Sequence, residues 1–518
     1  MKTQAIPPTG KDQAFEVSET FFSTTDAKGI ITAGNRIFTR TSGYCTEELV
    51  GQPHNIIRHP DMPRLVFRML WDACRGGRPF MGYVKNQAKN GNHYWVFAVI
   101  VPIPGGFLSI RFKPTSPLHP RVEAMYAKML AAEEAAIAAG SSEGRAADAA
   151  VAVAESEMGK AGFDSYEACS HQALNTEIKA RDAEVARRGL TLFPEGIDGD
   201  GPESTGLREF YRESLATYRS IDELFRLLDS FILLCDGIRV RKDAVQTIAK
   251  DFRLNALNAN IAAHALGEHG VALAIVAQNL SGHGDGLSRD VGALAANIVR
   301  TIAAVTDSAS NLSAARLQVE MLLGFTAELS AGGCGQSERT QALAIIGDLR
   351  AAFATTLQHA FAAIGRLQLQ LPAVMASKED LRKDIIYLHV TQMTGLTEVA
   401  RLPQAEGLVA TFADLRAQIE EGKRELDQLE GIVEKLVALT GESPAKMAGI
   451  RLAMESMREV ATEPISSGGG EVSGMALSGS PSDADADDEE GVYRCGERPR
   501  EVGEAATRGT RTSRWLRP

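Results

Sequence analysis

The chain has 518 residues, more than one hydrophobic core usually serves, so we expect several structural units. Its formal net charge of -11 argues against nucleic acid as a partner, because binding phosphate groups needs clustered Lys and Arg. Hydrophobic residues make up 44% of the chain and aromatic residues only 6%, which indicates Ala- and Leu-rich helices around real cores.

The composition also bears on the redox compartment and on membranes. The six cysteines are scattered and form no CxxC pair, which favours reduced thiols over a disulfide framework or a zinc site. The first residues, MKTQAIPPTGKDQAF, lack the apolar core of a signal peptide. No run of about 18 uncharged apolar residues is present that would span a membrane. We therefore expect a cytoplasmic protein.

Residues 20–115 follow a flexible N-terminus over residues 1–19 and mix strand and helix patterns. Two short β-like runs, FFSTTD and GIITAGN, come first, and short helices follow. A longer helix begins near Pro63 and ends at Gly76, and three strand-like runs close the segment. This order predicts an α+β domain with one antiparallel, five-stranded sheet and helices packed on one side.

The connector GQPHNIIRHPDMP, residues 51–63, concentrates polar side chains on a stiff segment. Its three prolines and one glycine prevent a continuous helix. Five polar residues crowd into eight positions: His54, Asn55, Arg58, His59 and Asp61. Taken alone, they fit local roles, with an Arg58–Asp61 ion pair and His59 capping the next helix. A prearranged ligand-contacting segment is the alternative.

Residues 116–195 are Ala-rich and charged, and they predict connecting helices. A Gly-, Asp- and Pro-rich loop then leads to residues 205–330, where apolar residues recur at alternating spacings of three and four. This seam runs from Ile221 to Leu266 and returns from Leu294 to Leu322, with a glycine-flanked turn near 267–270. The pattern predicts an antiparallel helical hairpin. Because such a hairpin needs a partner to cover its seam, we expect a homodimer.

Further amphipathic helices are expected over residues 335–460, roughly at 337–371, 378–401 and 408–440. Within this region, QAEGLVATFADLRAQI is faintly similar to LGEHGVALAIVAQNL of the hairpin, too weakly to establish a repeat. Residues 464–518 are low in complexity, acidic and then basic, which predicts a disordered tail.

The N-terminal unit resembles the PAS domain of the bacterial aerotaxis receptor family. The resemblance covers about ninety residues and rests on GQPHNIIRHPDMP, on MGYVKNQAKNGNHYWVFAVIVPI and on LSIRF. It implies a sensory PAS fold that binds FAD without a covalent bond and reports its redox state. Arg58, His59 and Asp61 match positions implicated in holding the flavin, and Asn35 and Asn86 match further positions of the pocket.

Two features bear on the expected cofactor. Phe80 stands where the family can carry a tryptophan, so ring stacking or redox tuning could differ here. Arg58 suits the pyrophosphate of FAD, because its guanidinium can donate two parallel hydrogen bonds. Haem is the alternative cofactor, with His54 or His59 as the axial ligand.

Residues 248–280 resemble the signalling tip of methyl-accepting chemotaxis proteins. Six positions of this tip match the family and are candidates for binding partners: Asn258, Ile261, Gly267, Glu268, Gly270 and Val276. The resemblance implies contact with a chemotaxis adaptor and a histidine autokinase. Two stretches depart from it, since residues 262–265 and 271–273 replace charged residues of the family with mostly apolar ones.

The sequence therefore predicts a cytoplasmic redox or oxygen sensor that transmits the state of FAD through a helical bundle to a chemotaxis adaptor and kinase. A PAS-gated scaffold or regulator outside chemotaxis is the alternative. No phosphate-binding loop, dinucleotide-binding glycine fingerprint or kinase motif is present, and His and Cys lack the spacing of metal ligands. We accordingly expect neither an enzyme nor a metal site.

Overall fold

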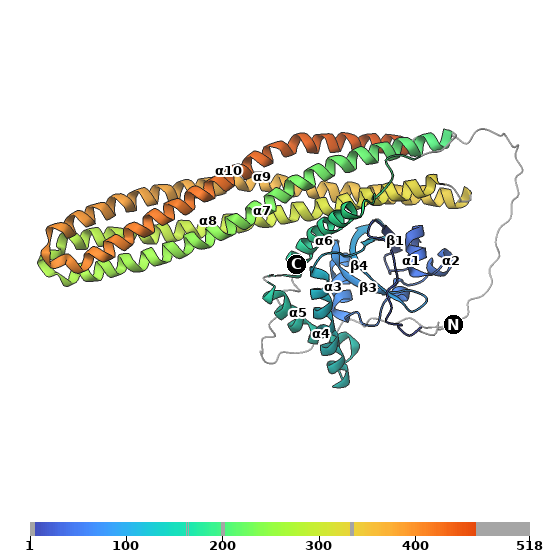
Figure 1. Ribbon diagram of the computed structural model, residues 1–518, viewed down its shortest axis with the longest axis horizontal. Helices are drawn as coiled ribbons and strands as arrows, with labels where there is room; N and C mark the ends of the chain where they lie inside the picture. Colours follow the sequence, from blue (N-terminus) through green and yellow to red (C-terminus); the bar gives the residue numbers. More distant parts are fainter. Residues whose placement is uncertain (1–5, 162, 164, 198–201, 332–335, 463–518) are drawn as a thin grey trace, which may run out of the picture. The chain divides into compact units, whose positions relative to one another are not determined.

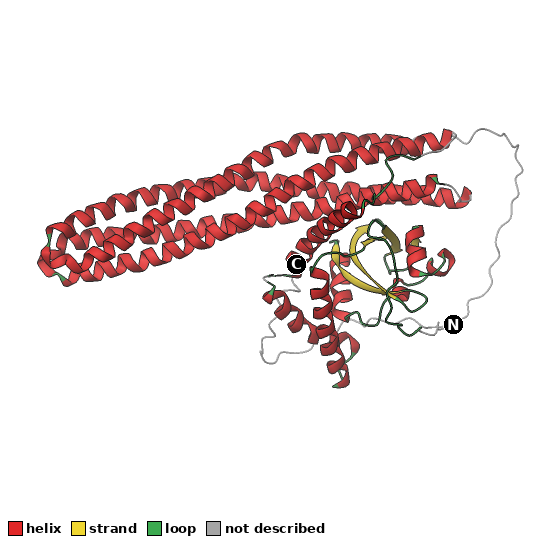
Figure 2. Cartoon of the chain, viewed as in Figure 1, coloured by secondary structure: helices red, strands yellow, loops and turns green. Residues whose placement is uncertain are grey.

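The computed structural model describes residues 6–161, 163, 165–197, 202–331 and 336–462. The expected disordered tail, residues 464–518, lies outside the described residues, as do residues 1–5 of the expected flexible N-terminus. Figure 2 separates the chain into one region that carries strands and a long helical region.

The strand-bearing region holds a sheet, short helices and one longer helix before β3. Its elements in chain order are β1 (Thr20–Asp26), β2 (Ile31–Gly34), α1 (Arg36–Ser42), α2 (Thr46–Leu49), the 3-10 helix η1 (His54–Ile57), α3 (Arg64–Arg75), β3 (Phe80–Gln87), β4 (His93–Ile103) and β5 (Gly106–Phe112). All strand pairs are antiparallel, in the order β2-β1-β5-β4-β3. The predicted five-stranded antiparallel sheet is confirmed.

Glycine allows β1 to pair with the first residue of β5. Gly106 lies opposite Asp26, and a Cβ atom there would lie 1.8 Å from the carbonyl oxygen of Thr25. Any side chain at this position would push the two strands apart. The central pairing of the sheet thus depends on a residue without a side chain.

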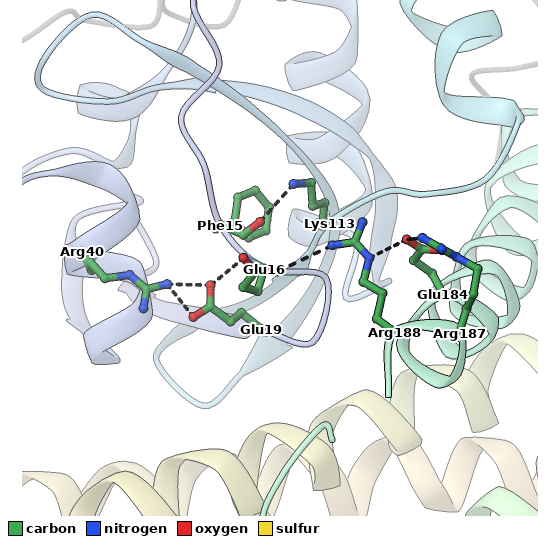
Figure 3. Close-up of polar contacts among 8 residues, drawn as sticks. All are labelled: Phe15, Glu16, Glu19, Arg40, Lys113, Glu184, Arg187 and Arg188. Carbon is green, nitrogen blue, oxygen red and sulfur yellow. Dashed lines mark hydrogen bonds and ion pairs between the residues drawn. The ribbon is translucent and has the colours of Figure 1, made fainter. Parts of the chain in front are cut away.

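The segment before β1 lies against the sheet. The Gln13 amide donates to the His93 carbonyl over 2.7 Å, and Phe15 and Val17 are buried. Figure 3 shows its polar contacts with α1, with the residue after β5 and with the end of α6: Arg40 with Glu19 at 2.5 Å, Lys113 with the Phe15 carbonyl at 3.0 Å and Arg188 with Glu16 at 3.7 Å. Residues 9–19 therefore extend the domain.

The two faces of the sheet have different neighbours, because successive side chains of a strand point to opposite sides. On β5, Phe107, Ser109 and Arg111 face a cavity that α3 and η1 also line. Phe112 faces the other way, where the guanidinium of Arg181 lies 5.0 Å from its ring. This outer face contacts α6 and α8, and Figure 1 shows α6 beside the sheet. A single layer of strands therefore separates the cavity from these helices.

Three helices connect the sheet to the long helical region: α4 (Leu118–Ala138), α5 (Glu143–Lys160) and α6 (Tyr166–Arg188). Two of their carboxylates are buried among donors of the sheet domain. Glu133 of α4 accepts the backbone N–H groups of Arg64 and Leu65, at the start of α3. Glu177 of α6 accepts from the Tyr83 hydroxyl and from Ser116. These contacts fix the connecting helices on the domain.

The long helical region consists of two hairpins. Its elements are α7 (Pro202–Ala265), the 3-10 helix η2 (Gly267–Gly270), α8 (Val271–Ser330), α9 (Gln336–Arg401), the 3-10 helix η3 (Pro403–Leu408) and α10 (Val409–Thr462). The predicted seam is confirmed by burial of Ile221, Phe231, Val245 and Ala256 on α7 and of Leu312 on α8.

The second hairpin packs on the first to complete a four-helix bundle within one chain (Figure 1). An ion pair of 2.8 Å between Arg241 and Glu425 joins α7 to α10, and the rings of His283 and Tyr387 stack between α8 and α9. Because α9 and α10 cover the seam of α7 and α8, the seam itself gives no reason to expect a second copy of the chain. The homodimer expected from an uncovered seam loses that support.

The two hairpins repeat one pattern. Phe252 of α7 and Leu388 of α9 are buried at equivalent distances before their turns, whereas Leu254 and Val390, two residues further along, are exposed. Both turns are 3-10 helices, η2 and η3, so the two hairpins are alike in structure. Bundle packing constrains which positions are apolar more than which apolar residue stands there.

The break that was expected between 371 and 378 is absent, and α9 continues through Pro372. Proline costs about 3 kcal/mol inside a helix. Burial of Leu367, Leu371, Val374 and Leu381 on both sides of it outweighs this cost. Within the described residues, no helix combines the length and the apolar character needed to cross a membrane.

Candidate functional site: a cavity behind the sheet

A cavity of about 260 Å³ lies between the inner face of the sheet, η1 and α3. Its lining residues come from β1, the β1–β2 turn, η1 and its flanks, α3 and β3 to β5: Thr25, Lys28, Gly29, Pro53, His54, Asn55, Arg58, Phe67, Leu70, Trp71, Val84, Asn86, Ala98, Ile100, Phe107, Ser109 and Arg111. The wall therefore combines aliphatic and aromatic side chains with a few polar groups, as is usual for small-molecule sites.

Aromatic side chains line the α3 side of the cavity. The ring of Trp71 meets the ring of Phe107 edge to face, with 5.7 Å between centroids. Phe67 lies on the same helix, one turn earlier, and carries the guanidinium of Arg58 4.0 Å above its ring. These flat surfaces suit a planar ligand.

Arg58 reaches the cavity because the connector is stiff. Pro53 precedes η1, and Arg58 ends it and forms an antiparallel bridge with Asn86 of β3. Its Nη2 donates to the Met62 carbonyl over 3.2 Å. Burial lowers the pKa of Arg58, although it stays charged. The connector thus carries a cation to the wall before any ligand is bound.

Arg111 of β5 is a buried cation in the cavity wall. Its Nη1 donates to Ser23 Oγ over 3.0 Å, and its Nη2 donates to His54 Nε2 over 2.7 Å. Both partners are neutral, and among the residues that the structure describes Arg111 forms no ion pair. Burial lowers the pKa of Arg111 to about 10. A buried charge without a counter-charge costs several kcal/mol, and it is usually kept for a function.

His54 is held in its neutral form. A guanidinium can only donate hydrogen bonds, so Nε2 of His54 is the acceptor and carries no proton. Burial, and then the charge of Arg111, bring the pKa of His54 well below its ordinary value. Ser23 Oγ lies 3.0 Å from the same nitrogen. Nε2 is therefore already occupied by two protein groups.

Two buried polar atoms of the cavity wall have no hydrogen-bond partner among the residues that the structure describes. They are Nδ2 of Asn86 and Oγ of Ser109. Leaving a buried donor or hydroxyl unpaired costs about 1–3 kcal/mol, so such atoms are rare. Together with Arg111, they form a polar strip on the sheet side of the cavity, opposite the aromatic side chains of α3.

The residues singled out from the sequence do not all lie together. Arg58 and Asn86 line the cavity. His59 is buried beside it, with Nδ1 accepting the Asp61 amide, and Asp61 pairs with Lys85 at 2.8 Å. Asn35 accepts the amide of Phe38 as the N-cap of α1. None of these three outer residues is part of the lining.

Phe80 also lies outside the lining. Its ring stacks on that of Tyr166 in α6, with 5.8 Å between centroids. The local alternative for the connector is not formed either, because Arg58 donates to Met62 whereas Asp61 pairs with Lys85. His59 interacts with Asp61 and not with the first N–H groups of α3, which Glu133 accepts.

Three lining residues of the cavity were not predicted from the sequence: Ser109, Arg111 and Trp71. A signal was present in FLSIRF, where an arginine and a serine alternate with apolar residues on a strand that is otherwise buried. Such alternation places both polar residues on one face. What the sequence could not reveal is that this face borders a cavity.

The expected partner-binding positions at the first turn are divided between surface and core. Asn258, Ile261, Gly267 and Glu268 are exposed, whereas Gly270 and Val276 are buried. A Cβ atom at Gly270 would lie 2.2 Å from the Ala263 carbonyl, so glycine is needed there to close the turn. Ile261 is the one large apolar residue among these exposed positions, and Leu257, Val271 and Ile275 near it are exposed as well.

Comparison with known proteins identifies the fold of the N-terminal region. Residues 31–106 match the family model described as PAS fold. The chain is 46% identical to the aerotaxis receptor of Escherichia coli (strain K12) over 112 residues, 21% of this chain and 22% of the receptor. It is 31% and 28% identical to the nitrogen fixation regulatory proteins of Klebsiella pneumoniae and Klebsiella oxytoca over 88 residues, 17% of this chain and 18% of each regulator. The chain thus spans about a fifth of the length of these relatives.

Proposed function

We propose that this aerotaxis-receptor-like PAS protein is a redox sensor that holds FAD in the cavity behind its sheet and passes the state of the flavin to the helical bundle. The observation that carries the proposal is the polar strip of the cavity wall. Arg111 lacks a counter-charge there, and Asn86 and Ser109 lack hydrogen-bond partners. All three are explained if a polar ligand edge occupies this strip.

The chemistry of the wall fits a flavin. The isoalloxazine ring is planar, with one apolar edge and one edge of carbonyl and nitrogen groups. Trp71 and Phe107 offer flat apolar surfaces, and Asn86, Ser109 and Arg111 offer hydrogen bonds to the polar edge. Arg58 and Lys28, which also line the cavity, are the cations suited to the phosphates. A bound flavin would supply reversible electron transfer at this position.

Other assigned positions act from outside the wall. His59 and Asp61 position the connector that carries Arg58, and Asn35 caps the helix that follows β2. Phe80 packs against α6. In this proposal they influence flavin binding through the shape of the domain.

Few residues separate the cavity from the helical bundle. Ser23 of β1 contacts Arg111 in the cavity, while Phe22 beside it meets Phe325 of α8 edge to face, with 5.1 Å between centroids. A change of hydrogen bonding at Ser23 therefore acts on the same strand that touches α8. Signalling by such a route is a shift between two packings of the sheet on the helices.

The proposed output is contact between the exposed part of the first turn and a chemotaxis adaptor and histidine autokinase. Ile261 and Glu268 are exposed there and available to a partner. A scaffold outside chemotaxis is the second candidate, favoured by the apolar replacements at 262–265 and 271–273. Co-purification with the adaptor distinguishes the two, since folded protein that fails to retain it contradicts the chemotaxis output.

The absorption spectrum and cofactor content of the purified protein test the ligand. We expect flavin bands and one FAD per chain. The variant Ala98→Phe fills the cavity and should lose the flavin, whereas Arg40→Gln, which alters an arginine on the surface, should keep it. If both variants contained the same amount of flavin per chain, the cofactor would bind outside this cavity. A colourless protein would contradict the proposal.

Haem is disfavoured by the state of the two histidines. Nε2 of His54 accepts from Arg111, and Nδ1 of His59 accepts the Asp61 amide. Nε2 of His54 cannot bind iron without breaking its bond with Arg111, and His59 is not among the lining residues of the cavity. A Soret band in the same spectrum would overturn this assignment.

A further inference from the structure

Four charged side chains and one threonine join β1, α6 and α8 in a buried cluster, which we call the clamp. It consists of Thr20, Arg181, Asp182, Arg316 and Glu320. α6 contributes an arginine followed by an aspartate, and α8 contributes an arginine and a glutamate one turn apart. Each helix thus gives one cation and one anion to the other.

The first half of the clamp is shut off from solvent. Arg181 Nη2 lies 2.5 Å from Glu320 Oε2, and the two side chains are 0% and 2% exposed. Thr20 Oγ1 donates to Glu320 Oε1 over 2.7 Å and accepts from Arg181 Nη1 over 3.1 Å. The threonine hydroxyl therefore links the sheet to both charges.

The second half joins α6 and α7 to α8. Arg316 Nη1 lies 2.8 Å from Asp182 Oδ2, and Arg316 Nε lies 3.0 Å from Asp222 Oδ1. Arg316 Nη2 also donates to the Tyr218 hydroxyl over 2.8 Å. Any sliding of α8 along α6 would separate both halves of the clamp at once.

Some polar atoms of the clamp lack hydrogen bonds. Nε of Arg181 and Oδ1 of Asp182 are buried without a hydrogen-bond partner among the described residues. Buried ion pairs contribute little net stability, and they contribute less when some of their atoms are unpaired. Their best-attested role is to fix a register or to switch between two. A second arrangement of the clamp therefore lies within reach of a modest change in free energy.

The clamp lies directly behind the polar strip of the cavity. Thr20 pairs with Phe112 across β1 and β5, and Arg111 is the next residue of β5. Arg111 bonds Ser23 of β1 on the inner face, while Thr20 bonds Glu320 on the outer face. The same two strands thus carry the cavity wall on one side and the clamp on the other.

We propose that the clamp is the switch through which the cavity controls the bundle. In one state Thr20 bonds Glu320 and the register of α8 on α6 is held. In the other, β1 has moved, this bond is lost and α8 settles in a different register. The identity of the ligand rests on the proposed function, but the coupling between cavity and clamp does not.

The test uses the full chain and the reciprocity of coupling. If the clamp and the cavity are linked, changing either one must alter the other by the same factor. Thr20→Val keeps the shape of the side chain and removes its hydroxyl. We expect it to change the dissociation constant of FAD by about 5-fold or more and to speed hydrogen exchange of α8 around Glu320. Thr247→Val, on the exposed side of α7, is the matched control and should do neither.

A second arm does not depend on flavin. Ala98→Phe fills the cavity, so it should alter hydrogen exchange of α8 around Glu320 in an otherwise unchanged protein and leave it unaltered in the Thr20→Val background. Unchanged exchange of α8 in the filled variant would overturn the switch even if FAD binds. Absence of FAD with a positive second arm would overturn the ligand and leave the switch standing.

Discussion

Arg111 is a buried charge without a counter-charge among the described residues. It is buried beside two neutral partners, and a buried charge of this kind is retained at a cost. Its partner His54 stays neutral because burial, and then the positive charge of Arg111, lower the pKa of His54. The polar residues of the cavity wall are therefore recognised by a missing counter-charge or a missing hydrogen-bond partner among the described residues.

The first prediction concerns Arg111→Met. Removing the unpaired charge should leave the urea midpoint of the flavin-free protein unchanged or higher, because the side chain stays long and becomes apolar. The same variant should bind FAD at least about 10-fold more weakly, which corresponds to the loss of one charge-assisted hydrogen bond. Fluorescence titration with FAD and urea unfolding measure the two effects. Destabilisation together with unchanged affinity would assign Arg111 to the core instead.

The second prediction concerns pH and His59. Burial lowers the pKa of His59 to about 4, although the Asp61 carboxylate 3.5 Å away opposes this. The unfolded chain binds the proton near pH 6.5, so stability is complete above that pH and falls as the pH drops from about 6.5 towards 4. His59→Leu should therefore lose less stability between pH 7 and pH 5 than the unchanged protein. An equal loss in both would mean that His59 titrates normally.

Residues of the site differ in how far the sequence could reveal them. Arg58 was indicated by the polar connector and by the family resemblance, and Asn86 by the resemblance; both line the cavity. Ser109 and Arg111 lie in a strand of otherwise apolar character. Their importance depends on which face of that strand borders the cavity, and this is decided by pairing with neighbouring β4 and with β1, which is far away in the sequence.

At the scale of elements, helices here are fixed by side chains from other elements. The start of α3 follows Pro63 and has no cap of its own side chains, and Glu133 of α4 accepts its first N–H groups at 2.8 and 2.9 Å. A carboxylate in this position satisfies orphan donors and complements the helix dipole.

The third prediction follows from this arrangement. Glu133→Gln keeps the size of the side chain but replaces one acceptor oxygen with a donor, which leaves a buried N–H unpaired. We expect the free energy of unfolding to fall by about 1–3 kcal/mol, measured by urea titration. Glu134→Gln, at an exposed neighbouring position, is the control and should change it little.

Elements of strong periodicity were predictable, and their ends were less so. The seam of α7 and α8 was evident because spacings of three and four recur over many turns. The continuity of α9 was not, because the local cost of Pro372 is visible in the sequence whereas the burial that offsets it comes from α8 and α10. The residue preferences of a short segment do not predict a helix boundary when packing against distant segments determines where the helix ends.

At the scale of the whole molecule, the second hairpin replaces a partner. Lys378 of α9 pairs with Glu430 of α10 at 2.5 Å, and Arg241 of α7 pairs with Glu425 at 2.8 Å, so both new interfaces are formed in cis. One sheet domain then serves one four-helix bundle. The sheet domain contacts the first hairpin, because the clamp joins it to α8.

The fourth prediction is that one chain forms a complete bundle and binds one flavin. Light scattering of the purified protein should give the mass of a single chain at low concentration, because the apolar seam is already covered. A stable dimer under these conditions would show that another surface, such as the exposed apolar residues near the first turn, drives association.

The proposed coupling is tested most directly by hydrogen exchange of the unaltered protein with its proposed flavin oxidised and then reduced. We expect reduction to change exchange in α8 around Glu320 and in α6 around Arg181, beyond the sheet domain. Changes confined to the lining of the cavity, with α6 and α8 unaltered, would contradict it.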